Sequence, residues 1–220
     1  MRGGLIEIIS VSESDDASEA RVKLSVQNEH GSEDILLLIR YDLLSCTELD
    51  ISTLPCVINE EQAELLNQTS EQTRAIRSAY RSVSCSPCTR KMLIYKLIGK
   101  GFARETAEFA ADFVDGKGYI DEEAYAVREC EKCLHKLWGR HRILSHLKSR
   151  GCSESAMEKA GKYLENSDFE LTCCDFLTKK YRTYPASEVQ LRKMYSGAIQ
   201  YGYSGDEIKK ALLLMKQKQK

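Results

Sequence analysis

The sequence predicts a mainly α-helical protein, in which three tandem three-helix repeats form an elongated array behind a small, acidic, strand-rich N-terminal α+β unit. Three observations support this fold class. A pattern of apolar residues around a glycine occurs three times, strand-like runs are confined to the first part of the chain, and the two parts carry opposite net charge.

The repeat is the most informative of these observations. Each copy has an apolar residue eight and four positions before a glycine, and others six, nine and thirteen positions after it. The glycines are Gly101, Gly151 and Gly202, which lie 50 and 51 residues apart. Such a period is typical of one supersecondary unit stacked on its neighbours, because a single pair of short helices cannot bury its own apolar stripe. Each glycine is expected to end a helix in the left-handed conformation.

The formal net charge of −1 hides a division of the chain. Residues 1–73 carry 4 basic and 15 acidic side chains, a balance of −11, whereas residues 74–220 carry 28 and 18, a balance of +10. A basic helical region suggests an anionic partner, such as nucleic acid or a protein that holds nucleic acid. The acidic part could lie across the basic helices and weaken adventitious binding of DNA.

Composition narrows the class of protein further. The 42% of apolar residues suffices for a packed core. The start of the chain is too poor in apolar residues for a signal peptide or a membrane span, so we expect a cytoplasmic protein. The nine cysteines sit inside helical patterns, which predicts reduced thiols rather than a disulfide framework. No coiled-coil seam is present, and we expect a monomer.

The first 68 residues predict the small unit. Strand-like runs occupy residues 5–11, 21–26 and 35–39, with turns at Asp15-Asp16 and His30-Gly31. A short helix is expected at residues 41–45, Pro55 interrupts the chain, and Asn59 caps the next helix. Three strands are few for a self-standing core, so this unit is expected to pack on helices or on a partner.

From Thr69 onward every segment is expected to be helical, and capping signals mark the helix starts. Thr69, Asp121 and Ser167 are predicted to open the long helices, and Ser187 and Ser204 to cap the two short helices of the last repeat. The predicted domains are residues 1–68, 69–120, 121–166 and 167–220.

One stretch resembles a known family. Gly118–Ala126 is similar to the Gly-Tyr-Leu-Asp-Asp-x-x-Phe-Ala stretch of RecX proteins, and Lys91–Phe102, Gly139–Gly151 and Tyr195–Leu214 resemble the three repeats of that family. The resemblance covers about residues 70–220. The chain departs from the family at Glu122, where aspartate is commoner, and at its Cys-Ser-Pro-Cys segment.

The resemblance implies a non-enzymatic modulator of the RecA recombinase. Such a protein binds the helical groove of the RecA filament on single-stranded DNA and limits filament growth, ATP hydrolysis and strand exchange, which ties it to homologous recombination, DNA repair and the SOS response. No catalytic residue, cofactor or metal is implied. A helical repeat protein that binds DNA directly is the alternative.

Basic side chains are the candidate contacts with the filament or with DNA. The densest run interleaves with apolar positions, so one short helix would present a positive ridge. A merely solvated helix face is the competing interpretation. The candidates from the three repeats are Lys91, Lys96 and Lys100, then Arg140, Arg142, Lys148 and Arg150, and finally Arg192 and Lys193.

Cysteine pairs and aromatic residues leave alternatives open. Cys85/Cys88 and Cys130/Cys133 have the spacing of zinc ligands, but the second pair lies mid-helix, and no strand precedes the first as a thioredoxin-like redox site requires. A thiol oxidoreductase using the first pair is a third candidate function. Aromatic residues of the repeats could stack on bases, although core packing explains most of them: Trp138, Tyr181, Tyr184, Tyr195, Tyr201 and Tyr203.

Overall fold

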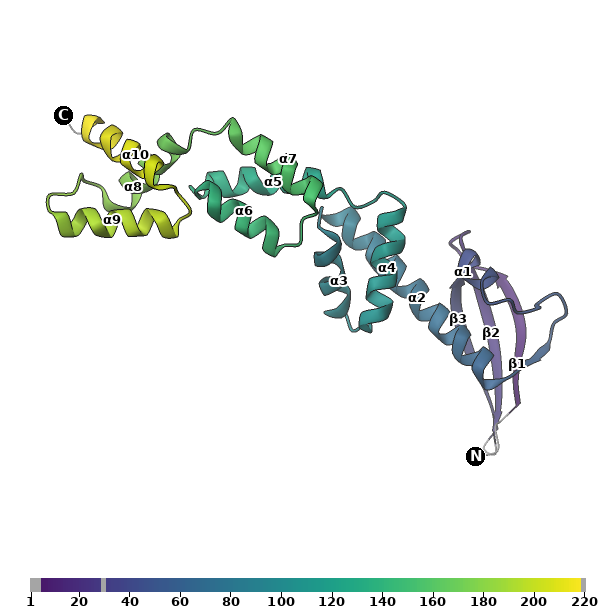
Figure 1. Ribbon diagram of the computed structural model, residues 1–220. Helices are drawn as coiled ribbons and strands as arrows, with labels where there is room; N and C mark the ends of the chain where they lie inside the picture. Colours follow the sequence, from purple (N-terminus) through teal and green to yellow (C-terminus); the bar gives the residue numbers. More distant parts are fainter. Residues whose placement is uncertain (1–4, 29–30, 219–220) are drawn as a thin grey trace. The chain divides into compact units, whose positions relative to one another are not determined.

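The computed structural model describes residues 5–28 and 31–218. The predicted turn residue His30 lies outside these residues. The chain divides into two compact units, which are described separately (Figure 1). Unit 1 comprises residues up to 85 together with 93–119, and unit 2 comprises residues 86–92 and those from 120 onward.

Helices dominate the structure, and the strands lie at its N-terminal end, as predicted (Figure 1). The strands are β1 (Leu5–Glu13), β2 (Glu19–Asn28), β3 (Gly31–Arg40) and β4 (Cys56–Ile58). The helices are α1 (Tyr41–Ser45), α2 (Glu60–Cys85), α3 (Arg90–Ile98), α4 (Arg104–Gly116), α5 (Glu122–His135), α6 (Arg140–Ser149), α7 (Glu154–Glu165), α8 (Phe169–Tyr181), α9 (Glu188–Gln200) and α10 (Gly205–Lys218). None of those described is long and apolar enough to cross a membrane.

Unit 1 is an antiparallel sheet backed by a long helix. The strand order is β3-β2-β1-β4, and β4 was not predicted, because three residues are too few to show an alternating pattern. Alternate residues such as Ile8, Val22 and Ile39 are fully buried and face α2 (Glu60–Cys85), which passes from β3 to α4 (Figure 1). The prediction that the strand-rich part packs on helices is therefore confirmed.

The predicted helix start at Thr69 is wrong. Helix α2 begins nine residues earlier, where the Asn59 carboxamide accepts the Gln62 N–H at 2.8 Å and Gln62 accepts the Asn59 N–H at 2.9 Å. Thr69 lies inside the helix, and its hydroxyl donates to the Leu65 carbonyl. The helix continues because no proline or glycine interrupts residues 60–85. The boundary drawn at residue 68 consequently falls within α2.

Most of the other predicted caps are confirmed. The Asp121 carboxylate accepts the Ala124 N–H at 2.8 Å, and the Ser187 and Ser204 hydroxyls cap α9 and α10. The prediction for Ser167 is wrong, since the cap of α8 is the next residue, Asp168, whose carboxylate accepts the Leu171 N–H at 2.9 Å. A carboxylate at this position also complements the positive end of the helix dipole.

The three repeat glycines adopt the predicted left-handed conformation. Their φ angles are +95° at Gly101, +77° at Gly151 and +94° at Gly202. After each glycine the next N–H donates to the carbonyl five residues before it, at 3.2–3.3 Å, as in the Schellman ending of a helix. The grouping of the helices into three three-helix repeats stays a prediction.

Within unit 2, the end of one short helix meets the start of another. The carbonyls of Tyr201 and Gly202, which end α9, accept the N–H groups of Gly139 and His141 at 2.9 and 3.1 Å at the start of α6. A Cβ at Gly139 would collide with the backbone of Gly202. These contacts satisfy backbone groups that helix ends leave unpaired.

Hydrogen bonds also join the start of α3 to the end of α6. The Thr89 hydroxyl donates to the Arg150 carbonyl at 2.7 Å and accepts the Met92 N–H at 3.1 Å. The carboxylate of Glu122, at the start of α5, accepts the Arg90 N–H at 2.9 Å and the Ser153 N–H at 2.7 Å. The Glu122 side chain thus accepts backbone N–H groups at the starts of α3 and α7. Glu122, which stands where RecX proteins commonly have aspartate, therefore has a structural role.

Candidate functional site

The predicted basic residues do not form one cluster. Lys96 and Lys100 belong to unit 1, where the ammonium of Lys100 donates to the hydroxyls of Ser78 and Ser82 at 2.8 and 3.0 Å. The other candidates belong to unit 2. Lys100 is therefore engaged in holding the end of α3 on α2.

The basic run of α6 divides between two ends of the helix. Arg140 donates to the Gly161 carbonyl at 3.3 Å and approaches Glu165 at 3.9 Å, so it is tied to α7. Lys148 and Arg150 are exposed near the C-terminal end, where Lys91 approaches the Ser149 carbonyl at 3.4 Å. The predicted positive ridge is therefore present only in part, because Arg140 contacts α7 and Arg142 lies against aromatic rings.

Arg142 has the most specific environment of the predicted residues. Its guanidinium lies 4.2 Å from the centre of the Trp138 ring and 4.6 Å from that of Tyr201. The backbone of Arg142 packs against Gly202, where a Cβ would collide with it. The glycine at the end of α9 therefore lets the arginine reach two aromatic faces, which a planar guanidinium stacks on better than an ammonium does.

Three lysines extend this arrangement. Tyr201 stacks on Phe176 with ring centres 4.2 Å apart, and the ammonium of Lys180 lies 5.3 Å from the Phe176 ring and 5.8 Å from that of Tyr201. Lys136 lies 5.6 Å from the Trp138 ring. We call the following set the cation–aromatic surface: Lys136, Trp138, Arg142, Lys179, Lys180 and Tyr201.

A shallow pocket of about 210 Å³ opens in this surface. Its lining consists of Lys136, Leu137, Phe176, Lys179, Lys180 and Tyr201, with no acidic side chain among them. The buried Tyr203 hydroxyl donates to the Leu137 carbonyl at 2.8 Å and fixes the loop before Trp138. Burial raises the pKa of Tyr203, so the phenol remains a donor.

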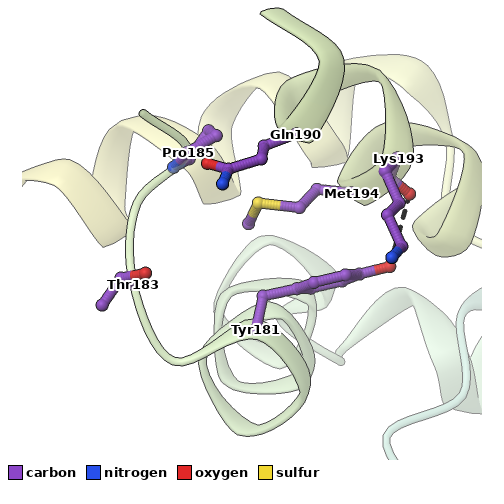
Figure 2. Close-up of a pocket in the computed structure, with 6 residues that line it drawn as sticks. All are labelled: Tyr181, Thr183, Pro185, Gln190, Lys193 and Met194. Atoms are coloured by element: carbon purple, nitrogen blue, oxygen red, sulfur yellow. Dashed lines mark hydrogen bonds between the residues drawn. The ribbon is translucent and has the colours of Figure 1, made fainter. Parts of the chain in front are cut away.

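A second pocket of about 210 Å³ lies where α8 ends and α9 begins (Figure 2). The ring of Tyr181 forms one wall, and its hydroxyl donates to the Lys193 carbonyl at 3.3 Å. Pro185, Gln190 and Met194 complete much of the lining. A third hollow, lined by Lys180, Tyr181 and Lys193 among others, adjoins both pockets through these shared residues. The three hollows therefore form a continuous series from Tyr201 to Lys193. The predicted contact residue Arg192 does not line them and pairs with Glu188 at 2.6 Å.

The chemistry of this surface suits an anionic, partly aromatic ligand. Lysine and arginine side chains attract phosphate groups or carboxylates, and aromatic faces stack on bases. Exposed lysines contribute charge without a fixed geometry, whereas Arg142 contributes a planar group held by two rings.

Comparison with known proteins finds relatives named regulatory protein RecX. No family model matches the chain. Regulatory protein RecX of Caldanaerobacter subterraneus subsp. tengcongensis is 27% identical over 157 residues, which are 71% of this chain and 78% of that protein. Regulatory protein RecX of Clostridium perfringens is 25% identical over 154 residues, 68% of this chain and 72% of that protein.

These two relatives confirm the predicted resemblance to RecX proteins. Solved structures agree in fold. A crystal structure of regulatory protein RecX matches with a TM-score of 0.70 at 18% identity and covers 93% of this chain and 98% of its own. The structure of RecX from Lactobacillus salivarius has a TM-score of 0.54 at 16% identity and covers 67% and 97%.

The RecX resemblance pointed to the repeats but not to every residue of the cation–aromatic surface. Lys136, Lys179 and Lys180 were missed, because helix ends often carry lysine for reasons unconnected with binding. Phe176 and Lys180 have the i, i+4 spacing that brings side chains together on a helix, which is the one local signal available.

The two cysteine pairs of this chain lie in unlike environments. Cys85 is exposed at the end of α2, and no strand precedes it, whereas Cys88 is buried. Cys130 and Cys133 are fully buried in α5, and burial raises the pKa of Cys130 to about 12. A thiol with so high a pKa is a poor nucleophile at neutral pH, which counts against redox chemistry by Cys130.

Proposed function

We propose that this chain is a non-enzymatic modulator of the RecA recombinase, which binds the RecA filament on single-stranded DNA and limits its growth, ATP hydrolysis and strand exchange. The observation that carries the proposal is the similarity to two regulatory proteins RecX over about 70% of the chain. The fold match to solved RecX structures supports it.

The cation–aromatic surface supports a contact with the DNA or with acidic side chains of the filament. Three of its members, Lys136, Lys179 and Lys180, are exposed, and none of them forms an ion pair with another described residue. We propose that the helices form three-helix repeats, so that this surface engages the filament while the other repeats contact neighbouring protomers. Asp121, one of the acidic residues of the RecX-like stretch, caps α5, and this contact supports a structural role for it.

The decisive experiment measures ATP hydrolysis by RecA on single-stranded DNA during titration with this protein. The test variant carries Lys136→Ala, Lys179→Ala and Lys180→Ala. We expect the wild type to inhibit hydrolysis, and the variant to need about tenfold more protein for half inhibition, if each exposed charge contributes about 0.5 kcal/mol.

A charge-matched control separates the surface from general electrostatics. Lys159, Lys162 and Lys209 are exposed lysines of unit 2 that pair only with surface carboxylates. Their triple alanine variant should inhibit as the wild type does. Equal weakening by both triple variants would refute a specific role for the cation–aromatic surface, and no inhibition by the wild type would refute modulation of RecA.

Direct binding of single-stranded DNA is the second candidate function. The partly exposed rings of Trp138 and Tyr201, with Arg142 and Lys180 near them, favour it because aromatic faces and cations together bind single strands. The same variants decide between the candidates. A direct binder holds a labelled oligonucleotide without RecA and loses affinity in the first triple variant alone.

A further inference from the structure

Three potential metal ligands from two helices converge inside unit 2. Glu129 and Cys133 lie one turn apart on α5, and His146 lies on α6. One oxygen of Glu129, the sulfur of Cys133 and a ring nitrogen of His146 all lie within 4.8 Å of one another. Of the two Cys-x-x-Cys pairs, this group includes only Cys133.

The surroundings hold these side chains in place. Cys133 is fully buried, and the side chains of Glu129 and His146 are only 15% and 19% exposed. His146 Nε2 lies 3.2 Å from Glu129 Oε1, and the His146 ring meets the Trp138 ring edge-on with centres 5.4 Å apart. The donor atoms therefore face one another in a largely enclosed site, which reduces the ordering cost of binding an ion.

We propose that Glu129, Cys133 and His146 bind a zinc-class divalent cation between α5 and α6. The donor set decides the class of ion. A thiolate and an imidazole favour Zn²⁺ or Co²⁺ over Mg²⁺ and Ca²⁺, which prefer oxygen ligands. Three protein ligands leave one tetrahedral position for water.

Three features oppose binding of the ion. Burial raises the pKa of the Cys133 thiol, so the ion must displace a proton. Lys132 donates to Glu129 Oε2 at 3.2 Å and competes with the ion for this carboxylate. The positive charges of Lys136 and Arg142 lower the pKa of Cys133 and so favour the thiolate, but they also oppose the ion.

The site has a consequence for the cation–aromatic surface. An ion held by α5 and α6 would fix the helix that carries Arg142. The ring of Trp138, a member of the cation–aromatic surface, contacts both His146 and Arg142 and so connects the proposed ion site with that surface. Because Trp138 is the only tryptophan of the chain, its fluorescence reports on the site without a label.

The test uses the full chain after treatment with a chelator and reductant. Titration with Co²⁺ should give a near-ultraviolet cobalt–thiolate absorption that saturates at one ion per chain, and Zn²⁺ should displace it and alter Trp138 fluorescence. Cys133→Ser should abolish the absorption. Cys85→Ser, which removes an exposed thiol elsewhere, should leave it unchanged.

Further variants protect the test against failure to fold. His146→Gln should weaken Zn²⁺ binding by more than the ~10–100-fold lost when an outer hydrogen-bond partner of a ligand is removed. Lys132→Ala changes an exposed side chain and should strengthen Zn²⁺ binding by up to about fivefold. A folded wild type that binds neither ion at one equivalent would overturn the proposal, as would a cobalt–thiolate band that persists in Cys133→Ser.

Discussion

Glu19, at the start of β2, is an ionisable side chain buried within unit 1. It is 1% exposed, and Arg77 of α2 lies 3.4 Å away as its ion-pair partner. Its Oε2 atom has no hydrogen-bond partner among the described residues. Burial raises the pKa of this carboxyl above the ordinary value of 4.5, and the attraction of Arg77 offsets the shift only in part.

A raised pKa makes the stability of unit 1 depend on pH in a definite direction. Between 4.5 and the raised value the folded state binds more protons than the unfolded state, so the free energy of unfolding falls as pH rises through this window. Below the window both states are protonated, and the contribution is constant. An ion pair that lowers the pKa of a carboxylate has the opposite effect, because the free energy of unfolding then rises with pH.

Glu19→Gln removes this titration and keeps the shape of the side chain. The variant should gain stability relative to the wild type as pH rises from 4.5 toward neutrality, which urea unfolding at a series of pH values measures. Glu13→Gln, at an exposed position of β1, serves as the control and should show no such trend. A constant difference between Glu19→Gln and the wild type would contradict the prediction.

At the scale of elements, local signals predicted the starts of most helices but not all. Asn59, Asp121, Ser187 and Ser204 cap as their spacing indicates, because a cap is decided by residues within one turn. Thr69 has the same spacing, yet it lies inside α2. A capping box opens a helix only where the preceding residues leave the helical conformation, and the residues before Thr69 do not.

The candidate site was less predictable than the fold. Arg142 was predicted from the basic run of α6, but its contacts with Trp138 and Tyr201 depend on how the end of α9 meets the start of α6. Lys136 and Lys180 come from two further segments. Tertiary packing brings these residues together, and no spacing in the sequence predicts their contacts.

The repeat glycines differ in their surroundings, and this difference gives a matched test. Both Gly101 and Gly202 have a strongly positive φ, but a Cβ at Gly101 would meet nothing within 4 Å, whereas one at Gly202 would collide with Arg142. Gly101→Ala should cost about 1–2 kcal/mol for the left-handed conformation alone. Gly202→Ala should cost about 2–5 kcal/mol, since overpacking adds to that strain.

Urea unfolding of the two variants measures these costs, and the RecA assay adds a functional readout. Gly202→Ala displaces Arg142 and should weaken inhibition at temperatures where the variant is still folded, while Gly101→Ala should inhibit as the wild type does. Equal losses of stability in the two variants would show that the contact between α9 and α6 adds nothing beyond backbone strain.

The whole molecule combines an acidic N-terminal part with a basic remainder, at balances of −11 and +10. Charges of this size act over distances set by salt, with a screening length of ~30 Å at 0.01 M and ~8 Å at 0.15 M. The acidic part should therefore oppose the approach of DNA at low salt, whatever contacts the basic helices make. Deletion of residues 1–68 would be a poor test, because the cut falls within α2 and removes the start of that helix with its buried Leu66.

Neutralising exposed carboxylates tests this effect without disturbing the fold. The variant carries Glu13→Gln, Glu33→Gln and Glu48→Gln, all at exposed positions of unit 1. Its affinity for a labelled single-stranded oligonucleotide, measured by fluorescence anisotropy, should rise roughly tenfold at low salt, the lower end of electrostatic steering effects. The gain should vanish near 0.15 M salt, where the charges are screened within ~8 Å.

A control variant distinguishes charge from side-chain replacement as such. It carries Ser12→Ala, Gln27→Ala and Thr53→Ala, which alter three exposed neutral side chains of the same unit and should leave the affinity unchanged. Unchanged affinity of the neutralised variant at low salt would mean that the acidic part does not influence DNA binding. A gain that persists at high salt would instead point to a direct contact, because screening removes only long-range interactions.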